Sequence, residues 1–163
     1  MKNGILLLAL VLGISLHRSS AAAPTDQVPD CPGAPSANNA QVLQWKTSTQ
    51  NQFTSRGHVQ GTIQRIFPDH SGHHHFELAL GSSPGDDVEI VFNEGFGTTP
   101  PLRSGMSVEA CGDYITAYAA SGGYPPSPDG ALIHWVHRSD NPGRHPSGFL
   151  VIDGTVYGQG KGK

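Results

Sequence analysis

From residue 57 to residue 160 the sequence is a series of short segments in which apolar and polar residues alternate, separated by turns rich in Gly, Pro, Asn and Asp. Alternation with a period of two is typical of a β-strand that buries one face. The segments predict five strands followed by a hairpin, over residues 57–67, 73–80, 88–93, 106–119, 131–137 and 148–160. The chain is therefore expected to be mostly β.

The order of these segments narrows the fold further. An irregular connection, EGFGTTPPLRSG (residues 94–105), separates the third strand from the fourth. Five short strands with a crossover at this point predict a small OB-like Greek-key barrel, the oligonucleotide/oligosaccharide-binding type, over residues 51–160 with a long C-terminal loop and hairpin. Gly112, inside the fourth strand, is a candidate β-bulge. A β-sandwich is the alternative, but it usually has about seven strands.

Residues 1–22 have the pattern of a secretory signal peptide. Lys2 precedes an apolar run from Ile5 to Leu16, and small residues follow. The run is shorter than the roughly 20 residues that a membrane span needs. We expect cleavage after Ala22 and a periplasmic or secreted protein with no membrane contact after cleavage.

Residues 23–50 are rich in Pro, Ala and Asn and are expected to form an extended leader, with a short helix as an option within residues 38–53. The two cysteines, Cys31 and Cys111, lie in this leader and in the fourth strand. An exported protein meets an oxidising compartment, which favours a disulfide between them. Two separate free thiols are the alternative.

The charge balance argues against nucleic acid as a non-specific partner. Loss of Lys2 and Arg18 with the signal peptide lowers the Lys and Arg count from 10 to 8 against 13 Asp and Glu, a net charge of −5. Non-specific nucleic-acid binding depends on a basic surface and is therefore not expected. A local basic patch near Arg138 and Arg144 is still compatible with this balance.

The segment HWVHRSDNPGRH (residues 134–145) concentrates side chains that bind metals or transfer protons. It contains His134, His137, Arg138, Asp140, Arg144 and His145. Neutral imidazole is a good ligand for zinc or copper and needs no help from a thiolate. A metal site here would use His134, His137, His145 and the carboxylate of Asp140.

The same segment carries a family resemblance. Residues 130–150 resemble the C-terminal signature of a family of small exported bacterial proteins, domain of unknown function 3465. The matching residues are Gly130, His134, Trp135, His137, Asp140, Arg144, His145 and Gly148, whereas Val136 and Phe149 depart from the signature. Upstream, His73 and Phe76 match the family's His-x-x-Phe strand, and Asn93 matches an asparagine that the family usually precedes with histidine, where this chain has Phe92. The resemblance covers residues 57–158 and implies a barrel-like fold and export, with no activity to carry over.

This resemblance adds His73 to the candidate ligands and Trp135 and Asn93 to the residues that would support them. Strand geometry raises an objection, because His134 and His137 have opposite parity and point to opposite faces of a regular strand. Both histidines can serve one site only if the strand ends or bulges near Val136. We then expect His73, His137 and His145 to converge on a polar pocket with Arg144 and Asp140 at its rim.

Three functions fit these residues. The first is an exported binding module with a histidine-centred site for a divalent metal, zinc or copper, or for another ligand. The second is a metal-dependent hydrolase of a phosphodiester or another anionic substrate, with His137 or His145 as base and Arg144 stabilising negative charge. The third is a structural barrel without a metal, in which the histidines brace a loop and a partner protein docks.

Overall fold

The computed structural model describes residues 27–163, so the predicted signal peptide (residues 1–22) lies outside the described residues. The alternating segments form seven strands: β1 (Thr54–Ile66), β2 (His73–Ala79), β3 (Asp87–Asn93), β4 (Ser107–Thr116), β5 (Ala131–His134), β6 (Phe149–Ile152) and β7 (Thr155–Tyr157). An α-helix, α1 (Asn39–Ser48), precedes them, and a short 3-10 turn, η1 (Glu94–Phe96), follows β3. The prediction of a mostly β protein is confirmed.

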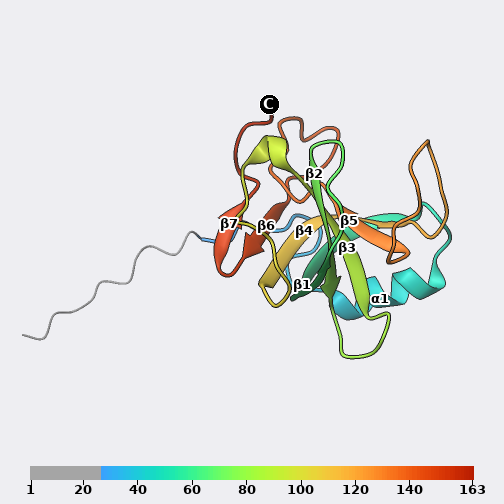
Figure 1. Cartoon of the computed structure of the whole chain (residues 1–163). Coiled ribbons are helices and arrows are strands. Elements are labelled where there is room, and N and C mark those ends of the chain that lie inside the picture. The colour runs from blue at the N-terminus through green and yellow to red at the C-terminus, as the bar shows by residue number, and fades with distance from the viewer. Residues whose placement is uncertain (1–26) are drawn as a thin grey trace, which may run out of the picture.

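Strands β1 to β5 close into a barrel in the order β1-β2-β3-β5-β4, because β4 also pairs with β1. Neighbouring barrel strands are antiparallel except β3 and β5, which are parallel. The crossover after β3 makes this parallel pair, and the predicted OB-like Greek-key barrel is confirmed. The β6–β7 hairpin lies outside the barrel, beside β4 (Figure 1).

One edge of β4 is shared by two strands. Its residues 113–116 pair with β5, and its residues 108–111 pair with β6. The chain leaves this edge after His134, forms a loop over residues 135–148, and returns to the same edge as β6. Gly112 stands at the point of departure, where an added Cβ would lie 2.2 Å from the carbonyl oxygen of His134. A residue without a side chain is needed because the two backbones approach so closely.

Apolar side chains fill the barrel, and the fully buried ones include Ile63, Phe76, Leu78, Ile90, Phe92, Tyr114 and Ile133. Helix α1 covers one end, where the Trp45 ring lies 5.3 Å from the ring of Tyr114.

No helix among the described residues is long and apolar enough to cross a membrane. Figure 1 shows η1, the β1–β2 connection and the C-terminus at the opposite end of the barrel. That end carries most of the predicted site residues.

The predicted disulfide is confirmed. Cys31 and Cys111 are bonded, with their Cα atoms 5.7 Å apart. Both sulfurs belong to a small apolar cluster on the outside of the barrel, together with Ala34, Phe149 and Val151. The disulfide therefore links the leader to β4, and the apolar cluster around it shields this contact from solvent.

Two details of the predicted strands are wrong. The fifth strand ends at His134 and not at His137. Gly112 pairs in regular register with Gly57, and the irregularity of pairing lies instead in β1, between Ile63 and Arg65. The early end of β5 matters most, because it releases the histidine segment from the sheet.

Candidate functional site

The strand-to-loop change at the end of β5 depends on one backbone angle. Trp135 has a φ of +56°, in the left-handed region that residues with a side chain rarely adopt. As a result Ile133 and Val136, three positions apart, both point into the core. The regular alternation of faces therefore ends at Trp135. The turn at Trp135 removes the parity objection, since His134 and His137 no longer belong to one regular strand.

Hydrogen bonds fold the loop of residues 135–148 back on itself. The Gly148 N–H donates to the His137 carbonyl over 2.7 Å, and the Ser139 N–H donates to the Ser147 hydroxyl over 3.1 Å. The Arg56 guanidinium, ion-paired with Asp113 at 2.6 Å, also donates to the Ser147 carbonyl. The loop is thus held at both ends against β1 and β4, and its histidines sit on a supported backbone.

Aromatic rings join the histidines of this loop into one cluster. The Trp135 indole stacks with His134 at 4.4 Å and with His145 at 4.5 Å between ring centroids. His137 stacks on Phe96 of η1 at 3.5 Å and meets His145 edge-on at 5.4 Å. The Trp135 ring therefore lies between His134 and the pair His137–His145.

A pocket of about 180 Å³ opens on one side of Trp135. It is lined by Phe96, Trp135, His137, Asp140, Asn141, Arg144 and His145, and we call it the Trp135 pocket. His73 does not line it. Its ring lies 5.6 Å from the ring of His134, with which it forms a separate pair. The structure thus places His137, His145, Arg144 and Asp140 together and His73 and His134 outside their pocket.

The hydrogen bonds of the imidazoles identify which nitrogen is free. Nδ1 of His137 lies 2.8 Å from the Arg138 carbonyl oxygen, and Nδ1 of His145 lies 3.0 Å from that of Pro146. A carbonyl oxygen has no proton to give, so Nδ1 carries the proton and Nε2 of the neutral ring keeps its lone pair. His73 is oriented in the same way by the carbonyl of Ser71.

Burial keeps the two innermost histidines in the neutral form. It lowers the pKa of His134 to about 4, with a further contribution from the neighbouring His73. Burial also lowers the pKa of His137, and the hydrogen bond to the Arg138 carbonyl opposes this shift. Nε2 of each ring is buried and has no hydrogen-bond partner among residues 27–163. Because Nδ1 of His137 carries the proton, Nε2 of this ring is the nitrogen that can act as a base or metal ligand near pH 7.

The carboxylate of Asp140 is already bound on both oxygens. Arg138 donates to Oδ1, and the Gly162 N–H donates to Oδ2 over 3.0 Å. Within residues 27–163, no three His, Cys, Asp or Glu side chains are grouped to hold a metal ion. A metal in the Trp135 pocket would use Nε2 of His137 and His145. Asp140 could become a further ligand only if its ion pair with Arg138 broke.

Asn93 supports the pocket from a distance. Its side-chain oxygen accepts a hydrogen bond of 2.8 Å from the Gly95 N–H at the start of η1. This bond fixes the turn that carries Phe96, the ring on which His137 stacks. The structure therefore gives Asn93 a contact with the backbone of η1.

A second row of titratable side chains on the outer face of β2 and β3 was not anticipated. The His75 Nδ1 lies 2.7 Å from Glu89, and both side chains are buried. Next to them Arg65 contacts Glu77 at 2.6 Å and Asp129 at 3.6 Å. The Asp129 side chain is only 3% exposed, and its Oδ2 has no hydrogen-bond partner among the described residues.

Asp129 predicts a measurable pH dependence of stability. Burial, together with the negative charges of Asp87 and Glu77, raises the pKa of Asp129 to about 7. Between about pH 4 and pH 7 the native carboxyl keeps a proton that the unfolded chain has lost, so stability falls as pH rises through this window. Asp129→Asn should therefore increase the free energy of unfolding at pH 8 by about 1–3 kcal/mol and change it little at pH 4.

Urea unfolding at both pH values measures this difference. Asp30→Asn is the matched control, because Asp30 is exposed. A gain for Asp129→Asn that is equal at pH 4 and pH 8 would contradict the assignment of the proton to Asp129.

Two other histidines have structural partners. His58 is buried, and its ring nitrogens contact the Ala34 carbonyl and Glu109 at 2.9 and 2.7 Å. His74 bridges Asp69 and Glu94 at 2.8 and 3.0 Å. These contacts hold the leader and the β1–β2 connection in place.

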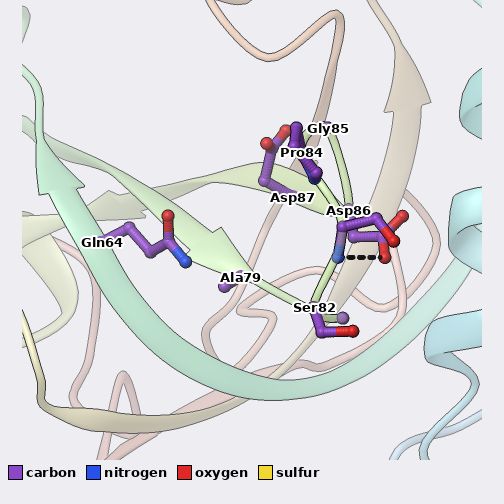
Figure 2. Close-up of a pocket in the computed structure, with 9 residues that line it drawn as sticks. Gln64, Ala79, Ser82, Pro84, Gly85, Asp86 and Asp87 are labelled. Atoms are coloured by element: carbon purple, nitrogen blue, oxygen red, sulfur yellow. Dashed lines mark hydrogen bonds between the residues drawn. The ribbon is translucent and has the colours of Figure 1, made fainter.

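Another hollow lies at the other end of the barrel. It measures about 390 Å³ and is lined by Gln64, Ala79 and residues 81–87 (Figure 2). Its two carboxylates already have partners, since Asp86 accepts the Ser83 N–H and Asp87 is ion-paired with Lys46. Without a free base or an aromatic ring, this hollow offers less chemistry than the Trp135 pocket.

No protein-family model and no curated protein matches this chain. Membership in the family that residues 130–150 resemble therefore stays a prediction.

Proposed function

We propose that this barrel binds a transition-metal ion, zinc or copper, in the Trp135 pocket through Nε2 of His137 and His145. The observation that carries the proposal is the orientation of these two imidazoles. Each holds its Nδ1–H against a backbone carbonyl, which leaves Nε2 as the free base. Histidines that bind metals in proteins are held in this way by a hydrogen bond on the other ring nitrogen.

The spacing of the rings supports the same proposal. The centroids of His137 and His145 are 5.4 Å apart. Two imidazoles bound to one tetrahedral ion at the usual zinc–nitrogen distance have centroids about 5 Å apart. The spacing of the two rings is therefore compatible with a shared ion. Asp140, or a bound anion or water, would complete the coordination.

The disulfide supports a location in an oxidising compartment, because such bonds persist there. We propose that the protein acts in the periplasm or outside the cell, as the pattern of residues 1–22 and the family resemblance both suggest. A metal held by neutral imidazoles suits such a compartment, since no thiolate has to stay reduced.

A structural role is the second candidate. The stacking of Trp135 on His134 and His145 favours it, because these contacts add to the hydrogen bonds that hold the loop closed and need no metal. In that case the histidines brace the loop and no metal binds. The two candidate functions predict different effects of replacing His145. The first predicts weaker metal binding, and the second predicts only a lower stability of the fold.

Calorimetric titration of untagged, metal-free protein with zinc and with copper tests the proposal. We expect one equivalent to bind and His145→Ala to weaken binding at least about tenfold, since one of two imidazole ligands is lost. His145 is half-buried, so the variant should fold. His70→Ala is the control, because His70 is an exposed histidine that does not line the pocket.

The proposal fails if the wild type binds neither ion and its melting temperature does not rise with zinc, copper or nickel. A lower melting temperature for His145→Ala, together with that result, would favour the structural role.

A further inference from the structure

We propose that the Trp135 pocket also binds a small dianionic oxyanion of the phosphate class, free or as a monoester, and that Arg144 and the C-terminal strap (residues 158–163) supply the positive charge. This inference stands on the charges and backbone contacts around the pocket. It does not require a metal to bind.

The distribution of cations is the first observation. Among residues 27–163 there are eight Lys and Arg, and four of them form ion pairs: Lys46, Arg56, Arg65 and Arg138. Those without an ion pair in this part of the chain are Arg103, Arg144, Lys161 and Lys163. Three of these four belong to the loop of residues 135–148 or to the C-terminal strap. An otherwise acidic protein thus concentrates its unpaired positive charge in one region.

The C-terminal strap is built to lie close against this region. Its sequence, GQGKGK, places a glycine at every second position, and an added Cβ at Gly160 or Gly162 would lie within 3 Å of Phe96. The Gly160 N–H donates to the Phe96 carbonyl over 3.1 Å, and the Gly162 N–H donates to Asp140. Phe96 and Asp140 both line the Trp135 pocket.

This contact places the backbone of the strap, which carries two lysines, beside residues that line the pocket. Lys161 and Lys163 flank Gly162 in sequence, and both are exposed. Arg144 lines the pocket itself. All three cations therefore belong to segments that border the pocket, and charges closer than about 10 Å reinforce one another at moderate salt.

The carboxylate of the pocket does not cancel this positive charge. Asp140 is ion-paired with Arg138 and accepts the Gly162 N–H, so its charge is already balanced. Arg144 presents a planar fork of donors that fits two oxygens of a phosphate group. The pocket therefore favours an anion that carries more than one negative charge.

The size and the walls of the pocket limit what can be attached to the phosphate group of the ligand. Its volume of about 180 Å³ is smaller than the roughly 300–1,000 Å³ of sites for drug-sized molecules. Phe96 and Trp135 line the pocket and give it aromatic walls that a small planar group can contact. The acidic remainder of the surface repels long polyanions. A small phosphate, alone or on a single ring, fits these limits.

Calorimetric titration of metal-free protein with inorganic phosphate, phenyl phosphate and acetate tests the inference. We expect phosphate to bind more tightly than acetate, and phenyl phosphate to bind several-fold more tightly than phosphate and to quench tryptophan fluorescence. Arg144→Gln should weaken phosphate binding at least tenfold, and the double variant Lys161→Gln/Lys163→Gln several-fold. Arg103→Gln is the matched control, since it removes an equal charge elsewhere, and its affinity should equal that of the wild type.

Two results would overturn the inference. One is no heat and no fluorescence change with wild-type protein at millimolar phosphate and phenyl phosphate. The other is an equal loss for Arg144→Gln and Arg103→Gln, which would show an effect of net charge only. The zinc and copper titrations, run in phosphate-free buffer, fail or succeed independently of both results.

Discussion

Replacing both cysteines of the Cys31–Cys111 disulfide with alanine is expected to lower the free energy of unfolding by about 4 kcal/mol. The bond closes a loop of 80 residues, so its loss returns a large amount of chain entropy to the unfolded state. It also joins the leader to β4 through the small cluster around Phe149. Alanine is preferred to serine because Cys111 is completely buried and a serine hydroxyl would need a partner.

Urea unfolding of the double variant, and of the wild type with and without reductant, measures this loss. Reduced wild type should unfold close to the double variant, and reductant should leave the double variant unchanged. A loss below about 1 kcal/mol would show that the leader is held by its packing and hydrogen bonds and that the bond adds little.

The barrel could be predicted because the features that indicate it, alternation and turn residues, lie within short segments of the sequence. Phe76 and Leu78 alternate with His75 and Glu77 along β2, and only the first pair enters the core. Turn residues mark the ends of each strand, and the long connection after β3 allows the parallel partner that closes the barrel. Period, turns and connection length together leave few alternatives to this topology.

The end of β5 could not be predicted, because no residue type marks it. Residue types that favour strands, Trp135 and Val136, continue past His134 in sequence, whereas Trp135 takes a positive φ that is unusual for its type. The cause is tertiary. The edge of β4 that pairs with β5 is taken over by β6 beyond Gly112, so the chain has to leave there.

The sequence predicted only those residues of the candidate site that lie close together along the chain. Residues 134–145 attract attention by composition, and His137, His145 and Arg144 do line one pocket. Phe96 and the C-terminal strap were missed, because they reach the pocket from distant segments through backbone contacts. Alternating glycines in GQGKGK are the one local sign, since a segment with a glycine at every second position can pack closely on one side.

Replacing Gly148 with alanine is expected to lower the free energy of unfolding by about 3 kcal/mol. An added Cβ at this buried position would lie 2.2 Å from the carbonyl oxygen of Cys111 and 2.4 Å from that of Trp135. Both neighbours are backbone atoms, so the loop of residues 135–148 has to move away from β4 and weaken the bond from the Gly148 N–H to His137.

Thermal unfolding and near-ultraviolet circular dichroism test this expectation, since movement of the loop alters the surroundings of Trp135. Gly143→Ala is the matched control in the same loop. Its Cβ would lie 3.3 Å from the side-chain oxygen of Asn141, which can move aside, so its melting temperature should stay near that of the wild type. Equal melting temperatures for the two variants would show that the loop tolerates displacement at Gly148. The histidines would then not owe their positions to the close contact between Gly148 and β4.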